Sequence, residues 1–368
     1  MCVIAGYSGE KRAAPILIDM IKRIEYFDGG YATGIATIHE GKLYVARAMG
    51  DVDMLLKMTN AMDLPGTTGI IHSRPGFDFF STTHPFLDRD EKLALVTNGS
   101  FAGTATDAYY AEMRRVADEL YDAGVRSRCG DDIKPEGFYE KFKTKDGRAF
   151  WSPEIRAFSV GLAAAQAENK RDAITDALKA GFERLPGDQI NVCIHAEVPD
   201  TISLATVTRP MSVLEAAGET YIASCAIAFP ENVAGKVTHL PQCSVVRVTP
   251  AGFSVIYDEM KGVRCEPVTE ETVAAFTAAL EEQIGKGGRP LGVYEIKKPN
   301  PWHEPMVDVD RADFRAEGDV LKPKMPAFYQ ALYRLYKAGR ITYYTDRLYA
   351  RDVAWPNKDC YFTKFKLT

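Results

Sequence analysis

The first two residues of the chain, Met1 and Cys2, could together supply a nucleophile and its base. Aminopeptidases remove an initial methionine when a small side chain follows, and Cys2 would then carry a thiol and a free α-amine. An α-amine has a pKa of about 7.7–8.0, so an appreciable fraction is neutral at pH 7 and can accept a proton. A thiol beside its own base is suited to covalent catalysis. The alternative is that Cys2 is a small buried residue without a chemical role.

Three apolar segments should position the residues that could do chemistry. Residues 3–5 form a strand directly after Cys2, and residues 69–71 form a buried strand that leads into His72, Ser73 and Arg74. Residues 93–96 form another buried strand, which runs into Asn98 and Gly99. Without further context, an arginine at a strand end lies on the surface, and an Asn-Gly pair after an apolar strand is a hairpin turn. His72 is expected to be a buried structural histidine.

The remaining periodicities predict an α+β fold. Apolar residues recur at helical spacing in five segments, and alternating or short apolar runs indicate a hairpin and further strands. Strands, then helices, then strands again favour two sheets between layers of helices. The expected helices span 13–27, 52–62, 106–123, 152–167 and 171–185, the hairpin 33–46, and the later strands 189–196, 201–207, 219–224, 244–248 and 252–257.

The composition changes after about residue 259, which predicts a domain over 1–258 and a C-terminal extension of unknown role over 259–368. A Gly-, Pro- and Lys-rich stretch at 286–305 is typical of a linker. Helices over 269–285 and 325–339 and strands over 340–344 and 361–366 indicate a small packed α/β appendix. An aromatic-rich docking surface is the alternative.

Charge and cysteine usage exclude several classes of protein. The net charge is −5 and no Lys/Arg block occurs, which argues against nucleic-acid and membrane-surface binding. No apolar run reaches the roughly 18 residues of a membrane span, and no secretion signal is recognisable. The seven cysteines include no C-x-x-C pair, so we expect reduced thiols, no metal, no cofactor and a cytoplasmic location.

Four segments of the first hundred residues resemble one family, with matching order and spacing. They are MCVIAGY, IKRIEYFDGGYATGIATI, GTTGIIHSR and LALVTNGSF. They are similar to the glutaminase domain of glucosamine-6-phosphate synthases, a class II glutamine amidotransferase of the N-terminal-nucleophile hydrolases. A looser similarity returns within 173–258, in INVCIHAEVPDTISLATV and YIASCAIAF. The resemblance implies a four-layer αββα sandwich, and the sugar-isomerase half of the synthase has no counterpart here.

The resemblance also implies roles for individual residues. Cys2 matches the nucleophile that attacks the glutamine carboxamide and releases ammonia through a thioester. Arg74 matches the arginine that holds the substrate α-carboxylate, a task that suits the bidentate guanidinium fork. Asn98 and Gly99 match the oxyanion hole, to which they would contribute a side-chain amide and a closely approaching backbone N–H.

The sequence departs from the family in the residues that recognise the substrate. Residues 75–79 differ from the family segment that lines the glutamine pocket. The family's aspartate for the substrate α-amine is replaced by Ser152, which cannot supply the charge. Glu154, Asp131 or Asp132 could replace that carboxylate.

Three functions are therefore open. The first is a glutaminase component that passes ammonia to a separate synthase subunit, with glutamine as substrate. The second is an N-terminal-cysteine amidase acting on a related amide. The third is a catalytically inactive regulatory or binding subunit. The sequence leaves a homo-oligomer open in each case.

Overall fold

A computed structural model describes most of the chain. The described residues are 2–75, 80–100, 107–129, 132, 143–286, 291–292, 320–321, 323–348 and 360–368. Asp131 and residues 76–79 lie outside these ranges. Nearly all of the predicted linker at 286–305 also lies outside them. No helix within the described ranges is both long and apolar enough to cross a bilayer.

One antiparallel sheet of seven strands holds the N-terminal strand near its middle, in the order β11-β9-β10-β1-β4-β2-β3. Because side chains alternate along a strand, Val3, Ala5 and Tyr7 of β1 pack against the helical side, whereas Ile4 faces the other sheet. The strands are β1 (Val3–Ser8), β2 (Ala32–His39), β3 (Lys42–Met49), β4 (Thr68–Arg74), β9 (Ser212–Ala216), β10 (Glu219–Ala223) and β11 (Lys236–His239).

A second antiparallel sheet has six strands in the order β13-β12-β8-β7-β6-β5. β6 continues through Asn98 and Gly99 and pairs with β7 along its whole length. The hairpin-turn alternative for this pair is therefore wrong. The strands are β5 (Phe86–Leu87), β6 (Leu93–Ser100), β7 (Asp188–His195), β8 (Val198–Thr206), β12 (Ser244–Thr249) and β13 (Gly252–Tyr257).

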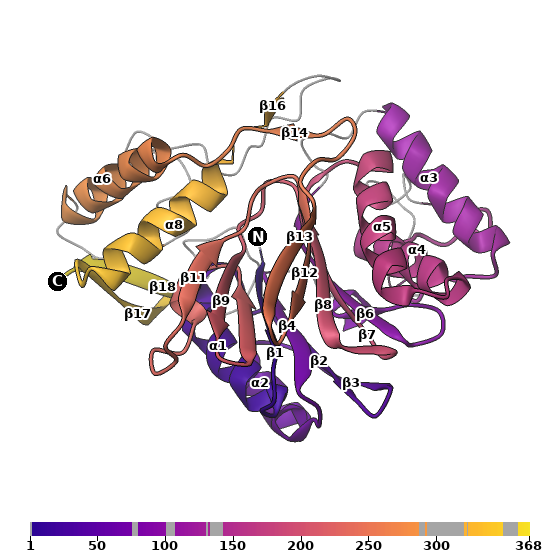
Figure 1. The fold of residues 1–368 in the computed structure, drawn as a ribbon, viewed down its shortest axis with the longest axis horizontal. Helices are drawn as coiled ribbons and strands as arrows, with labels where there is room; N and C mark the ends of the chain where they lie inside the picture. Colours follow the sequence, from indigo (N-terminus) through magenta and orange to yellow (C-terminus); the bar gives the residue numbers. More distant parts are fainter. Residues whose placement is uncertain are drawn as a thin grey trace.

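The two sheets share an apolar core between them, to which Ile4 and Ile70 contribute from the first sheet and Val96 and Ile202 from the second. Helices cover the outer sides: α1 and α2 pack on the first sheet, and α3, α4 and α5 lie on the side of the second (Figure 1). The result is a mixed α/β architecture. The helices are α1 (Ala13–Asp28), α2 (Val52–Met58), α3 (Asp107–Asp122), α4 (Ser152–Gln166) and α5 (Lys170–Arg184), with short 3-10 turns η1 (Ala61–Asp63), η2 (Phe80–Thr82) and η4 (Ala226–Ala228).

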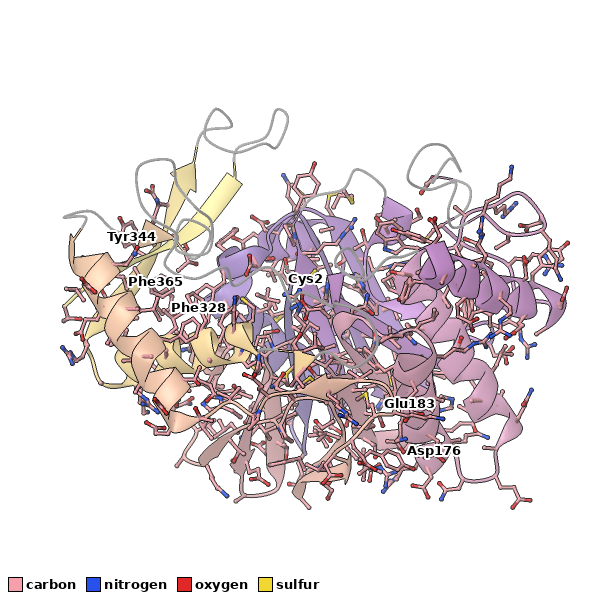
Figure 2. All side chains as sticks on the ribbon, turned by 90° about the horizontal axis from the view of Figure 1, so that it is seen from above. Cys2, Asp176, Glu183, Phe328, Tyr344 and Phe365 are labelled. Atoms are coloured by element: carbon pink, nitrogen blue, oxygen red, sulfur yellow. A yellow bond between two sulfur atoms is a disulfide. The ribbon has the colours of Figure 1, made fainter. Side chains whose placement is uncertain are left out.

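The C-terminal region packs against α1 and shares its hydrophobic core. The Phe27 ring of α1 stacks on Tyr329 at a centroid distance of 6.4 Å and meets Phe365 edge-on at 5.4 Å. Phe328 and Phe365 are fully buried in this region, to one side of Cys2 (Figure 2). Its elements are α6 (Glu270–Lys286), α8 (Lys324–Lys337), β14 (Arg264–Cys265), β15 (Leu291–Gly292), β16 (Val320–Leu321), β17 (Ile341–Leu348) and β18 (Cys360–Leu367).

A disulfide joins Cys243, directly before β12, to Cys265 in β14. The expectation of reduced thiols is therefore wrong for this pair. The two cysteines are 22 residues apart and share no recognisable spacing motif, so only the folded chain brings them together. The bond connects the two sides of the boundary expected near residue 258.

Glu25 is a buried carboxylate that ties α1 to three other elements. Its Oε1 accepts hydrogen bonds from Ser73 Oγ at 2.7 Å and Thr33 Oγ1 at 2.9 Å, and Val52 N donates to the carboxylate at 3.0 Å. Burial raises the pKa of Glu25 to about 7, although hydrogen bonds from Ser73, Val52 and Thr33 favour the charged form. These bonds fix the end of β4 beside the end of α1.

Replacing Glu25 by Gln should change how stability depends on pH. The folded-state pKa lies above the ordinary value of 4.5, so the folded protein loses stability as the pH rises from about 4.5 to about 7. The free energy of unfolding of the variant, relative to the unchanged protein, should therefore rise by about 3 kcal/mol across this window. Urea denaturation at several pH values measures it.

Taking the difference between the two proteins removes an opposite contribution from His72 and His84. Burial lowers the pKa of both, so each destabilises the fold as the pH falls below its ordinary value of 6.5. A difference between variant and unchanged protein that stays constant with pH would contradict the assigned protonation of Glu25.

Candidate active site

Two reciprocal hydrogen bonds join Cys2 to Asn98. The backbone N of Cys2 donates to Asn98 Oδ1 at 2.9 Å, and Asn98 Nδ2 donates to the carbonyl oxygen of Cys2 at 2.7 Å. Cys2 precedes β1 of the first sheet, whereas Asn98 belongs to β6 of the second, so this pair bridges the sheets. A side-chain amide nitrogen carries two hydrogens. The same nitrogen can therefore hold Cys2 and also serve a second acceptor.

Gly99 has a backbone conformation that only glycine tolerates at this place. Its φ is +120°, and an added Cβ would lie 2.0 Å from the carbonyl oxygen of Asp188 in β7. The close approach of β6 and β7 thus requires glycine directly after Asn98. This contact fixes the backbone of the two residues in one orientation toward Cys2.

Buried histidines support the same end of β6. His72 Nε2 lies 3.1 Å from the carbonyl oxygen of Thr97, and the His84 ring lies against His72 at a tilt of 36°, with centroids 3.9 Å apart. Burial, together with the charge of Arg74, lowers the pKa of His72 to about 3, so the ring is neutral at pH 7. His72 is buried near its strand end, as expected from the sequence.

Arg74 ends β4 beside the start of β1, where Val3 pairs with Ser73. Its side chain is buried, and Nη2 donates to Thr82 Oγ1 at 2.5 Å. The charge of Arg74 also lowers the pKa of the Cys2 thiol. The structure therefore brings Arg74 to the same sheet edge as Cys2.

The electrostatic environment of the thiol includes two residues that the sequence did not single out. Burial raises the pKa of Cys2, the positive charges of the chain's amino terminus, Arg74 and Arg209 lower it, and Asp28 raises it. Arg209 is buried and forms an ion pair with Asp188. Asp28 ends α1, where a carboxylate faces the negative end of the helix dipole. For Asp28, an acidic residue at the C-terminal end of a predicted helix was a signal that the sequence offered.

Glu154 lies at the start of α4 with its carboxylate engaged by neighbouring groups. Its oxygens accept hydrogen bonds from Ser127 Oγ at 2.8 Å and from the backbone N of Arg128 and Trp151. Burial raises its pKa despite these bonds. This network holds residues 127–129 against the helix, so its bonds favour a structural role for Glu154.

The other acidic candidates are not brought to Cys2 by any contact of the described residues. Asp132 is exposed, with its backbone N bonded to Cys129 O at 3.1 Å. Asp131 lies outside the described ranges. Ser152 is the first residue of α4 and, like Glu154, belongs to that helix start.

Comparison with known proteins gives both sequence and fold relatives. The glutamine–fructose-6-phosphate aminotransferase (isomerizing) of Pyrococcus horikoshii is 29% identical over 235 residues, covering 62% of this chain and 33% of the relative. The enzyme of the same name from Thermosynechococcus vestitus is 28% identical over 275 residues, covering 73% and 38%. The chain thus spans little more than a third of the length of these relatives. No model of a known protein family matches it.

The solved structure of the glutamine phosphoribosylpyrophosphate amidotransferase from B. subtilis has the same fold. It superposes with a TM-score of 0.53 at 15% identity, covering 77% of this chain and 58% of that one. The chain resembles class II glutamine amidotransferases in sequence and fold.

Proposed function

We propose that this chain hydrolyses the side-chain amide of glutamine and releases ammonia, with Cys2 as an N-terminal nucleophile after removal of Met1. The observation that carries this proposal is the reciprocal pair between Cys2 and Asn98. After Met1 is removed, the α-amine of Cys2 would donate to Asn98 Oδ1. The Nδ2 of the same asparagine would then lie close enough to act as an oxyanion donor. A nucleophile, its base and an oxyanion donor are then supplied by two side chains and one terminus.

In the first half of the reaction, the neutral α-amine takes the thiol proton and the thiolate attacks the carboxamide carbon. The amide oxygen becomes an oxyanion, which Asn98 Nδ2 and the backbone N–H of Gly99 would stabilise. The C–N bond then breaks, and the leaving nitrogen takes the proton from the α-ammonium and departs as ammonia. A γ-glutamyl thioester on Cys2 remains.

In the second half, the α-amine takes a proton from water as the water attacks the thioester. The same oxyanion donors stabilise the second tetrahedral intermediate, and the C–S bond breaks to give glutamate and the thiolate, which recovers its proton. The net reaction consumes one glutamine and one water and gives glutamate and ammonia. Arg74, buried beside Cys2, would pair with the substrate α-carboxylate.

A second candidate is an amidase whose substrate has a carboxylate but no α-amine. It is supported by the uncharged Ser152 at the start of α4 and by the hydrogen bonds that occupy Glu154. Among the candidate acids, Glu154, Asp131 and Asp132 each stay open as the group that receives a substrate ammonium.

We further propose that the amidotransferase-like region corresponds to residues 1–258, arranged as a four-layer αββα sandwich, and that 259–368 is an extension. The two facing sheets with helices outside them support this layering. The released ammonia would serve a synthase partner in a cytoplasmic reaction. The proposal is supported by the sequence relatives, whose name includes an aminotransferase activity.

The function is tested by maturation, labelling and ammonia release together. Native protein should lack Met1, release ammonia from glutamine and be labelled on Cys2 by a glutamine-mimicking electrophile, because the α-amine activates only that thiol. Cys2→Ala should abolish both signals. Cys193→Ala is the matched control, since Cys193 is a buried thiol in β7 and should leave both unchanged. Retained Met1 with an unlabelled Cys2 would instead support the inactive regulatory subunit.

Asn98→Ala should lower turnover by about 10²–10³, the usual loss for one oxyanion donor, with a smaller change in KM. The control is Asn191→Ala, which removes another buried asparagine, on β7, whose Oδ1 accepts from Thr97 Oγ1 at 2.6 Å. That change should cost stability but leave turnover within a few fold. Steady-state ammonia release measures both. Equal losses in the two variants would mean that Asn98 has only a structural role.

A further inference from the structure

The turn after α1 brings Asp28 to the end of the sheet at which β1 begins and β4 ends, where Cys2 lies. Gly30 N donates to Ser73 Oγ at 2.8 Å, and Tyr31 N donates to the carbonyl oxygen of Arg74 at 3.0 Å. Ser73 in turn pairs with Val3, the residue after Cys2. The end of α1, the end of β4 and the start of β1 therefore meet at one place.

A glycine makes this approach possible. A Cβ on Gly29 would lie 2.7 Å from both the Glu25 carbonyl oxygen and Ser73 Oγ, so a larger residue would push the turn away from β4. Glu25 also accepts a hydrogen bond from Ser73. The turn that carries Asp28 is thus fixed from two sides, and the position of its carboxylate is set by the core.

Asp28 and Arg74 together present charges of both signs beside the thiol. The charge of each acts on the Cys2 thiol, and the two act in opposite directions. This matches the head group of a free α-amino acid, whose carboxylate suits Arg74 and whose ammonium needs an anion. Arg209, whose charge also acts on the thiol, forms an ion pair with Asp188.

Asp28 also fits an ammonium better than the other acids do. A carboxylate at the C-terminal end of a helix is destabilised by the helix dipole, and a bound cation would offset that effect. Glu154 accepts several donors at the start of α4, and Asp132 is exposed.

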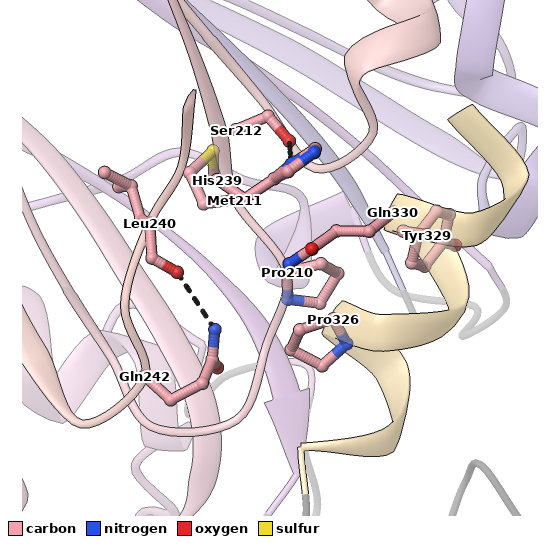
Figure 3. A pocket seen from close by; sticks show the side chains of 9 residues that line it. All are labelled: Pro210, Met211, Ser212, His239, Leu240, Gln242, Pro326, Tyr329 and Gln330. Atoms are coloured by element: carbon pink, nitrogen blue, oxygen red, sulfur yellow. Dashed lines mark hydrogen bonds between the residues drawn. The ribbon is translucent and has the colours of Figure 1, made fainter. Parts of the chain in front are cut away.

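Tyr329 of α8 holds the Asp28 carboxylate from the C-terminal region. Its hydroxyl donates to Asp28 Oδ2 at 2.9 Å, and its ring stacks on Phe27. Tyr329 also lines a cavity of about 10 Å³ together with Pro210, the residue after Arg209 (Figure 3). A carboxylate has about four acceptor positions, so this bond is compatible with a second, charged donor.

We propose that Asp28 receives the α-ammonium of the substrate and so selects free α-amino acid amides, with Tyr329 as the residue that positions it. This inference rests on the proposed amide hydrolysis at Cys2. It places the counter-charge that Ser152 cannot supply at the end of α1 and links substrate choice to the C-terminal region.

The test compares kcat/KM for glutamine and for its des-amino analogue, glutaramate, in the full-length mature protein. The unchanged protein should prefer glutamine. Asp28→Asn should lower kcat/KM for glutamine by about tenfold to a hundredfold, mainly through KM, and leave that for glutaramate within about threefold. Asp19→Asn, at an exposed carboxylate of the same helix that pairs with Arg23, is the matched control, and it should leave the preference unchanged. Thermal unfolding checks that each variant is folded.

Tyr329→Phe separates the charge of Asp28 from the docking of α8. It removes the hydrogen bond that positions Asp28 but keeps the ring on Phe27 and the charge on Asp28, so the preference for glutamine should fall, but by less than in Asp28→Asn. If Tyr329→Phe abolishes the preference as fully as Asp28→Asn, the effect belongs to helix docking and the proposal is overturned. Equal losses for both substrates in Asp28→Asn would overturn it too, because Asp28 would then serve the Cys2 amine.

Failure of the proposed hydrolysis and failure of the Asp28 assignment give different results. If the unchanged protein releases ammonia from neither amide, the proposed hydrolysis itself is wrong. If it hydrolyses glutaramate as well as or better than glutamine, the hydrolysis stands and the assignment of Asp28 is wrong.

Discussion

The pair of hydrogen bonds between Cys2 and Asn98 is the constraint on which the site depends. The two residues are 96 positions apart and belong to different sheets, so their distance is fixed only when both sheets pack on the shared core. The Oδ1 and Nδ2 atoms of Asn98 each form a hydrogen bond with one backbone group of Cys2, which leaves little rotational freedom for either residue. Gly99 and the buried His72 then hold Asn98 from the side of the second sheet. Cys2 lies near a chain end, which would otherwise fray, and these contacts make it a fixed part of the fold.

The positive charges around Cys2 oppose the effect of burial on the pKa of its thiol. Burial alone would keep the thiol protonated, whereas Arg74 and Arg209 favour the thiolate and Asp28 opposes it. Because the pKa of the thiol is raised overall, the thiol needs a base at the moment of attack, which the α-amine would supply. Asp28 and Arg74 would then serve mainly to bind and orient a zwitterionic substrate. In this account, binding and activation are done by different groups.

Much of the scaffold could be predicted from periodicity. α1, α4, α5, the β2–β3 hairpin and most strands of both sheets lie where apolar spacing indicates them, whereas β5, β9 and β11 were not predicted. Cys2, Arg74 and Asn98 could be singled out from the sequence because each adjoins an apolar run that predicts a strand. Local rules misled in two cases. An arginine at a strand end is expected on the surface, but Arg74 is buried, and an Asn-Gly pair has a strong turn preference, but β6 and β7 pair through it.

The missed features depend on contacts between distant segments. Asp28, Arg209 and the Cys243–Cys265 disulfide gain their meaning from neighbours that no local pattern specifies. The same holds for the C-terminal region. Its aromatic residues suggested an appendix or a docking surface, but Phe328, Tyr329 and Phe365 are buried against α1. Through Tyr329, this region also contacts Asp28, whose charge acts on the Cys2 thiol.

The central claim is that Cys2 becomes acylated during turnover, and acid-quenched mass spectrometry tests it most directly. Mature protein mixed with excess glutamine, quenched in acid and digested should give an N-terminal peptide that begins at Cys2 and carries a γ-glutamyl group, which hydroxylamine removes. The adduct should disappear in Cys2→Ala. A protein that releases ammonia from glutamine without any adduct on Cys2, or with the adduct on another cysteine, would contradict the account.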